Sequence, residues 1–243
     1  MGEETDMPVG ILVDVAAVLS GSLIGAVLGS RILPRIKEAL PVIFGVIALC
    51  LGISLMIQVH SLSAVALALI LGTIIGEFLQ IQKGLDRISA KLNDRIQQGK
   101  ESEDGKAKVL ADYISVLVLF CASGTGIFGA LQEGMTGDAS ILMVKSILDF
   151  FTAIIFATSV GYLMLTIAIP QLTIYMLLFF SASLILPLMS ETMLLDFKAC
   201  GGIVTMCVAL RMLQVQPIRV VNLLPSLVLV APLSYVWQAL LGA

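Results

Sequence analysis

The chain has 243 residues, of which 58% are hydrophobic and 13% charged, with a formal net charge of −3. A soluble domain carries about 25% charged residues, so this composition excludes a soluble globular protein and indicates an integral membrane protein. The cysteines lie in apolar runs without the paired spacing of a metal site, so we predict no metal and no other cofactor. They are Cys50, Cys121, Cys200 and Cys207.

Eight segments are long and apolar enough to cross a bilayer, which takes roughly 20 residues. They cover residues 9–30, 40–58, 61–82, 109–132, 139–168, 171–190, 194–215 and 219–241. The pattern predicts an all-α membrane protein, with residues 1–243 forming a single polytopic domain. Residues 1–8 are expected to form a short external tail.

The basic residues predict the orientation of these segments. Of the 14 Lys and Arg residues, 12 lie in the connections after the first and third segments or flank the turn after the seventh. Such residues are retained on the cytoplasmic side, so both termini are predicted outside. The connection at 83–108 begins with a basic amphipathic pattern, which indicates either a helix on the inner membrane surface or a solvated helix, before a polar linker.

Two alignments indicate an internal repeat. Residues 46–56 (VIALCLGISLM) match residues 203–213 (IVTMCVALRML), and residues 20–30 match residues 181–191 after a four-residue slip. The first three segments would then correspond to the last three in the opposite orientation. Inverted repeats of this kind are common in secondary transporters.

Two segments carry small residues at every fourth position, which lets helix backbones approach closely. We expect packing within the monomer or across a homodimer, and a substrate path is the less favoured alternative. These residues are Ala17, Gly21, Gly25 and Gly29 in the first segment, and Ala64, Ala68, Gly72 and Gly76 in the third.

Asp149 lies about ten residues into the fifth segment, which at roughly 1.5 Å per residue places it near the bilayer centre. A carboxylate there costs about 2.5–3.5 kcal/mol, so its side chain should face protein or water. Lys145 lies one turn earlier on the same face. The two form either a structural ion pair or an ion-responsive pair beside a substrate site.

Residues 124–129 (GTGIFG) match the G-x-G-x-x-G pattern of dinucleotide-binding proteins. We reject that function because the motif needs a preceding buried strand, and here it lies in a membrane segment. We predict a helix broken around residues 123–126, where Ser123, Thr125 and the backbone of Gly124 and Gly126 would contact a substrate or ion. The alternative is a continuous helix whose glycines allow close packing.

Three further polar residues are candidates for ion binding. Asp14 lies near the start of the first segment, where it would contact either the site or the outer headgroups. Glu77, near the inner end of the third segment, would snorkel inward, pair with a basic residue or bind a cation. Asn222 precedes Pro225, and its amide would satisfy a proline-freed backbone group or face a cavity.

Three stretches, LGTIIGE, GALQEGMTGDASILMVKSILDFFTAIIFA and NLLPSLVLVAPL, resemble segments that mark the YqgA/YdfK-like family of bacterial inner-membrane proteins. The resemblance covers nearly the whole chain. It implies a polytopic protein of the bacterial inner membrane and suggests a transporter without naming a substrate. Members of that family tend to have Asn where this chain has Asp14, so the resemblance does not imply a shared carboxylate there.

These features favour a small secondary transporter that forms a homo-oligomer such as a dimer and whose coupling ion is H⁺ or Na⁺. Asp149 would bind that ion, with Glu77 as second candidate. The alternatives are an ion channel or a membrane protein with a structural or regulatory role. An enzyme is not expected, because no nucleophile–base pair or metal-ligand spacing is found, and the basic residues lack the aromatic neighbours of a nucleic-acid site.

Overall fold

The computed structural model describes residues 7–28, 34–84, 87, 113, 116–117, 120–121 and 123–241. Within these residues the chain forms helices and turns, and no strand occurs among them. The all-α prediction is therefore confirmed for this part of the chain. The predicted amphipathic helix and linker at 83–108 lie almost wholly outside it.

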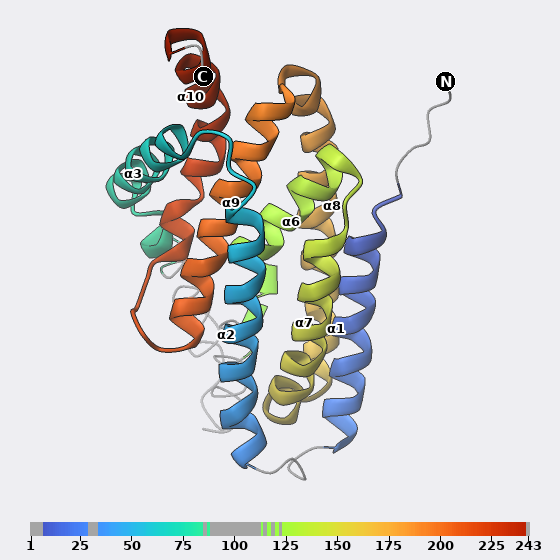
Figure 1. The fold of residues 1–243 in the computed structure, drawn as a ribbon. Helices are drawn as coiled ribbons and strands as arrows, with labels where there is room; N and C mark the ends of the chain where they lie inside the picture. The colour runs from blue at the N-terminus through green and yellow to red at the C-terminus, as the bar shows by residue number, and fades with distance from the viewer. Residues whose placement is uncertain are drawn as a thin grey trace. The chain divides into compact units, whose positions relative to one another are not determined.

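Most of the helices are long (Figure 1), and those long enough to cross a membrane are apolar. The α-helices are α1 (Val9–Leu28), α2 (Pro34–Met56), α3 (Leu62–Leu79), α6 (Gly124–Thr136), α7 (Ser140–Val160), α8 (Ala168–Ile185), α9 (Glu191–Met212) and α10 (Pro225–Leu241). Three 3-10 helices accompany them: η2 (Gly161–Ile167), η3 (Leu186–Leu188) and η4 (Val220–Leu223).

The chain folds into two compact units, each assembled from segments that are distant in sequence. Unit 1 comprises Met1–Glu38 and Leu85–Leu184, and unit 2 comprises Ala39–Gly84 and Ile185–Ala243. Unit 1 thus holds α1, α6, α7, η2 and nearly all of α8. Unit 2 holds most of α2 together with α3, η3, α9, η4 and α10.

In unit 1, α1 packs along α7, and the two helices lie side by side in Figure 1. The glycines of α1 make this close approach possible. A Cβ at Gly21 would overlap the backbone carbonyl of Phe150, and one at Gly25 would overlap that of Ile154. Of the two kinds of packing expected for this small-residue stripe, Gly21 and Gly25 therefore show packing within the monomer.

Two hydrophobic clusters stabilise unit 1, and α1 contributes to both. One contains Val18 and Phe120, and the other contains Ile11 and Tyr175. Asp14 lies between Ile11 and Val18 along α1, about one turn from each. A buried carboxylate is therefore held between two apolar clusters.

In unit 2, α3 packs against α10 and η4 through the second small-residue stripe. A Cβ at Gly72 would overlap the backbone of Ser226, and one at Gly76 would overlap the carbonyl of Asn222. The start of α3 is capped from α9, because Asp196 accepts the backbone N–H groups of His60 and Ser61 at 3.0 and 2.7 Å. This stripe, too, packs within the monomer.

Six candidate membrane spans occur in the described residues by length and composition. One of them, Ser140–Leu188, is 49 residues long and contains both α7 and α8. The two helices are antiparallel, because Gln171 of α8 lies beside Asp149 of α7 while the connecting turn is at Gly161. The predicted count of eight is not confirmed, since much of the segment at 109–132 lies outside the described residues.

The boundary predicted at residue 168 for the fifth segment is wrong, because α7 ends at Val160. Gly161 has φ = 69°, a left-handed conformation that favours glycine, and it ends the helix. The inverted repeat is likewise not confirmed. Neither proposed copy forms a unit of its own. The first helix of each copy, α1 or α8, lies wholly or mostly in unit 1, and the other helices of both copies lie wholly or mostly in unit 2.

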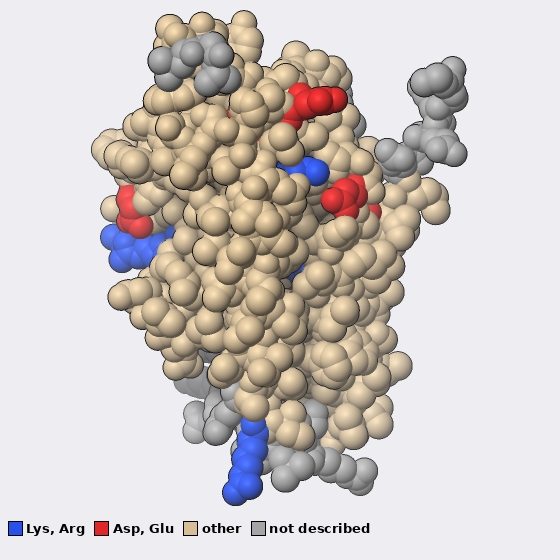
Figure 2. All heavy atoms as spheres, viewed as in Figure 1, with Lys and Arg blue, Asp and Glu red and all other residues tan. Residues whose placement is uncertain are grey.

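Charged side chains are few on the face shown in Figure 2, and residues other than Lys, Arg, Asp and Glu cover most of it. Large hydrophobic side chains are exposed on many helices, including Phe78 at 87% and Ile169 at 69%. An exposed surface of this composition fits contact with lipid rather than with water. The chain is therefore a membrane protein.

Candidate functional site

The helix that precedes α6 is interrupted at Ser123. Phe120 and Cys121 are helical, whereas Ser123 is extended, with φ = −65° and ψ = 125°, and α6 begins at Gly124. The Ser123 hydroxyl caps the new helix by accepting the backbone N–H of Gly126 at 3.4 Å. The predicted break is thus confirmed at Ser123.

A tyrosine from α8 satisfies a backbone group beside this break. The Tyr175 hydroxyl donates to the carbonyl oxygen of Phe120 at 2.8 Å, and the tyrosine side chain is fully buried. In an apolar environment an unpaired carbonyl costs several kcal/mol, on the order of a lost hydrogen bond or more. Tyr175 therefore stabilises the interrupted helix.

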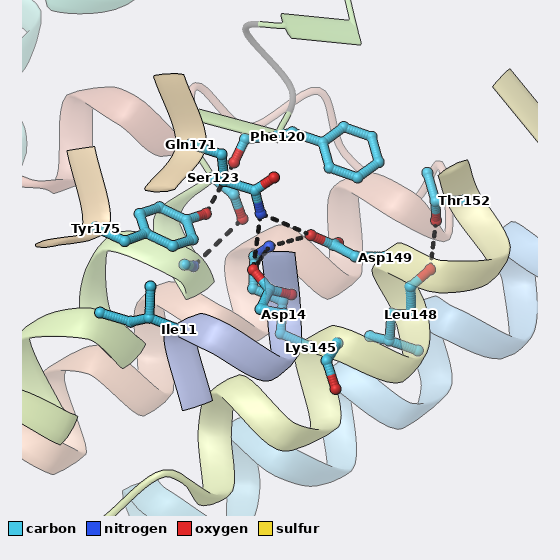
Figure 3. A network of polar contacts seen from close by, with 12 residues as sticks. Ile11, Asp14, Phe120, Ser123, Lys145, Leu148, Asp149, Thr152, Gln171 and Tyr175 are labelled. Carbon is cyan, nitrogen blue, oxygen red and sulfur yellow. Dashed lines mark hydrogen bonds and ion pairs between the residues drawn. The ribbon is translucent and has the colours of Figure 1, made fainter. Parts of the chain in front are cut away.

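Four polar side chains from α1, α7 and α8 meet in unit 1, and we call them the Asp14 cluster: Asp14, Lys145, Asp149 and Gln171 (Figure 3). Lys145 Nζ lies 3.1 Å from Asp14 Oδ2 and also contacts Asp149 Oδ2. Gln171 Nε2 donates to Asp14 Oδ2 at 2.7 Å and to Asp149 Oδ2 at 3.4 Å. The two carboxylates thus share the same two donors.

The cluster is almost closed to the surroundings. The side chains of Asp14 and Lys145 are 0% and 4% exposed, whereas that of Asp149 is 15% exposed. Two carboxylates face one ammonium, so the formal charge is −1. Asp14 Oδ1 and Gln171 Oε1 are buried and have no hydrogen-bond partner among the described residues.

Aromatic rings complete the surroundings of the ammonium group. Lys145 Nζ lies 5.3 Å from the centre of the Tyr175 ring and 6.0 Å from that of Phe120. These distances fit cation–π attraction, which supplements the two carboxylates. The Tyr175 hydroxyl also donates a hydrogen bond to the backbone carbonyl of Phe120. The helix break and the Asp14 cluster therefore form one continuous site.

Of the residues predicted for this site, the structure brings Asp14, Lys145 and Asp149 into direct contact. The alternative that Asp14 reaches the outer headgroups is wrong, because its side chain is fully buried against Lys145.

Gly126 lies next to the cluster, since a Cβ on it would overlap the Tyr175 hydroxyl and approach Lys145 Cε at 2.8 Å. Gly124 and Thr125 are buried in the first turn of α6. The contacts described for the cluster do not include these two residues.

Glu77 and Asn222 lie in unit 2 and are not part of the Asp14 cluster. Glu77 pairs with Arg219 at 2.9 Å and accepts from Asn222 Nδ2 at 2.9 Å. Asn222 Oδ1 accepts the backbone N–H of Gln82 at 2.8 Å, just beyond the end of α3. Pairing with a basic residue, one of the three roles expected of Glu77, is therefore confirmed.

Gln171, Tyr175 and Glu133 are site residues that the sequence analysis missed. Glu133 is 2% exposed and accepts the backbone N–H groups of Gly10 and Ile11 at 2.6 and 3.2 Å, which fixes the start of α1 one turn from Asp14. The available signal was polarity itself. A Glu or Gln within an apolar segment needs a partner, so each indicates an inward-facing position.

An open groove of about 660 Å³ runs along α3 in unit 2, lined mainly by apolar residues with Thr73 and Glu77. Its lining residues belong to one exposed helix face. It contains none of the residues of the Asp14 cluster, and we assign it no role in that site.

Comparisons with known proteins give relatives without an assigned activity. Residues 9–235 match the family model "Protein of unknown function (DUF554)". "Uncharacterized protein YqgA" of Escherichia coli (strain K12) is 43% identical over 233 residues, covering 96% of this chain and 99% of the relative. "Uncharacterized membrane protein YdfK" of Bacillus subtilis (strain 168) is 21% identical over 236 residues, covering 95% and 97%.

No solved structure matches the chain. The family model spans nearly the whole sequence, and the first relative is similar along its full length. The resemblance to YqgA and YdfK noted from three short stretches is thereby confirmed. The chain belongs to the DUF554 family of proteins of unknown function.

Proposed function

We propose that this protein is a small secondary transporter of a solute or ion in the bacterial inner membrane. The observation that carries the proposal is the Asp14 cluster, a buried group of two carboxylates, one ammonium and one amide beside a broken helix. Buried ionisable groups and interrupted helices mark substrate and ion sites in membrane transporters.

The charge of the cluster favours this function over a purely structural one. A structural ion pair needs one carboxylate for one ammonium. Each further buried charge costs several kcal/mol, because it must be removed from water. Here a second carboxylate is buried within reach of the same lysine. An excess charge of this kind is more readily explained by a site that takes up a cation during its working cycle.

Each residue has a role in the proposed mechanism. Asp149, the more exposed of the two carboxylates, receives the coupling ion. Ser123, Thr125 and the first-turn backbone of α6 contact the substrate. Glu77 and Asn222 are left out of the proposed site, because they bond to Arg219 and to the end of α3.

A non-transporting structural or regulatory protein is the second candidate, with an ion channel as a further alternative. Direct contact and near-complete burial of Lys145 and Asp149 favour the structural role, because a sealed ion pair can simply hold α7 against its neighbours. The two candidates differ in one consequence. Only a transporter or channel loses solute movement when Asp149 is neutralised.

The test begins with a thermal-shift screen of the purified protein against ions, amino acids and organic acids at several pH values. A stabilising solute is then used for uptake into proteoliposomes. We expect Asp149→Asn to abolish coupled uptake, whereas Glu191→Gln, at an exposed carboxylate on α9, leaves it unchanged. Unchanged uptake by Asp149→Asn would remove the coupling role from this residue.

Eight crossings with both termini outside, the inverted repeat and a homodimer belong to the same proposal. The repeat is supported within unit 2 by the pair α2 and α9. The alignment pairs Met56 with Leu213, and its extension by one residue pairs Gly45 with Gly202. A Cβ at Gly45 would approach Leu213, and one at Gly202 would approach Met56, so aligned residues make equivalent contacts.

A further inference from the structure

The Asp14 cluster has one carboxylate more than it has ammonium groups. A ligand that neutralises the cluster must therefore carry one positive charge. Asp14 and Asp149 both present their Oδ2 atoms to Lys145 and Gln171. Two buried carboxylates in one site do not both stay ionised at low cost. Resting on the proposed function, we infer that the coupling ion is a single proton, which enters at Asp149 and binds Asp14.

The titratable groups that the structure describes around the pair are all consistent with one added positive charge. Lys145 comes from α7 and Tyr175 from α8, and Cys121, before the break, interacts electrostatically with Lys145 and Asp149. Lys145 is the one cation among these neighbours. A tyrosine hydroxyl and a thiol do not supply positive charge, so they leave the excess of the carboxylates in place.

Glu133 of α6 is the remaining carboxylate near this part of α1, and it does not enter the balance. Its two oxygens accept the backbone N–H groups of Gly10 and Ile11. Donors at a helix N-terminus carry partial positive charge and stabilise an ionised carboxylate there. Burial opposes these two donors and raises the pKa of the Glu133 carboxyl. The excess charge that faces Lys145 is that of Asp14 and Asp149.

A proton fits this site better than a metal cation does. Lys145 Nζ already lies where the two Oδ2 atoms converge, so a metal ion there would meet an ammonium group. Hard cations need a shell of several oxygen ligands. The part of the chain that the structure describes holds no group of three or more His, Cys, Asp and Glu residues suited to a metal ion.

Burial assigns a role to each carboxylate. Asp149 is 15% exposed and is the point of entry, whereas Asp14 is fully buried and its Oδ1 has no partner within the described part of the chain. In the proposed step a proton from solution passes through Asp149 and binds Asp14 Oδ1, converting carboxylate to carboxylic acid. No other bond forms or breaks. Lys145 then pairs with Asp149 alone, and the cluster is neutral.

Infrared spectroscopy of the purified protein in lipid nanodiscs tests this inference directly. Titration from acid to alkaline pH should show one buried protonated carboxyl group that loses its proton as the pH rises. The carbonyl band of that group should disappear in Asp14→Asn and in Asp149→Asn. Removing either carboxylate leaves one carboxylate for one ammonium, and no proton is then needed. Glu191→Gln serves as control and should keep the band.

Two results would overturn the inference. One is a band that persists in both Asp14→Asn and Asp149→Asn, since the proton would then lie elsewhere. The other is a band midpoint that shifts when sodium chloride replaces choline chloride at constant ionic strength, because Na⁺ would then compete for the site. Both variants are close in shape to the parent residue, and a thermal-unfolding transition checks that each is folded.

The outcome also separates this inference from the proposed function. A transporter that couples to another ion would lose uptake in Asp149→Asn and would show no titrating carboxyl band. That result contradicts the proton assignment alone. A protein that shows the band but moves no solute keeps the proton site and loses the transport function. Uptake and band lost together in Asp149→Asn support both.

Discussion

At the scale of the residue, the site is organised by Lys145. Its ammonium group contacts two carboxylates and lies over two aromatic rings, and its side chain is 4% exposed. An ammonium buried to this extent is tolerated only with good partners. The partners come from three helices, so this one side chain connects α1, α7 and α8.

Replacing Lys145 with Met should destabilise the protein by about 3–5 kcal/mol, because two carboxylates are then left buried without a cation. The measurement is thermal or denaturant unfolding in detergent. Lys198→Met, at a partly exposed lysine of α9, is the matched control and should cost far less. Combining Lys145→Met with Asp14→Asn and Asp149→Asn should recover most of the loss. A triple variant no more stable than Lys145→Met would contradict this explanation.

Tyr175→Phe should cost about 1–3 kcal/mol, since it leaves the buried carbonyl of Phe120 without its donor. The aromatic ring remains in the variant, so its packing in unit 1 and its contact with Lys145 are kept. Tyr235→Phe removes a hydroxyl from a residue that is 64% exposed and is expected to be neutral. Equal melting temperatures for the two variants would show that the hydroxyl does not stabilise the helix break.

At the scale of the element, each unit contains a helix whose start is capped by a carboxylate from another helix. Glu133 of α6 caps α1 in unit 1, and Asp196 of α9 caps α3 in unit 2. A carboxylate at a helix N-terminus accepts hydrogen bonds from otherwise unpaired N–H groups, and its negative charge interacts favourably with the helix dipole. In a membrane protein this also keeps an acidic side chain away from lipid, so the caps serve both helices.

Gly21→Ala should separate α1 from α7, because the added Cβ would overlap the carbonyl oxygen of Phe150. Overpacking of this kind costs about 1–3 kcal/mol, and the shift should also weaken the contact between Asp14 and Lys145. Gly84→Ala is the matched control, since a Cβ there meets nothing within 4 Å. If Gly21→Ala melts at the same temperature as Gly84→Ala, the close contact between α1 and α7 at Gly21 does not contribute to the stability of the protein.

The sequence predicted the long apolar helices and the break at Ser123, because these depend on local composition. It also identified Asp149 and Lys145, since charge within an apolar run is visible without a structure. It did not pair them with Asp14 or Gln171, which lie 131 and 26 residues from Lys145 along the chain. Contacts between distant segments depend on packing, which a single sequence does not specify.

At the scale of the whole molecule, the contacts within each unit agree with the alternation of sides predicted from basic residues. In unit 1 the start of α1 meets the end of α6 through Glu133. In unit 2 the start of α3 meets the first turns of α9 through Asp196, and the end of α3 meets η4 through Asn222. Each meeting joins chain ends that the predicted topology assigns to the same side of the membrane.

Cysteine labelling tests that topology in a variant without the native Cys50, Cys121, Cys200 and Cys207. His60→Cys lies in the exposed turn before α3 and should react with a membrane-impermeant maleimide in intact cells.

Val215→Cys, 59% exposed between α9 and η4, should react only after the membrane is permeabilised, because Arg211 and Arg219 predict a cytoplasmic position for this turn. Labelling of Val215→Cys in intact cells with protection of His60→Cys would reverse the assigned orientation. Labelling of both from outside would break the alternation of crossings in unit 2. Since α3 and α9 both lead from the His60 side to the Val215 side, these two positions together test whether each helix crosses the membrane.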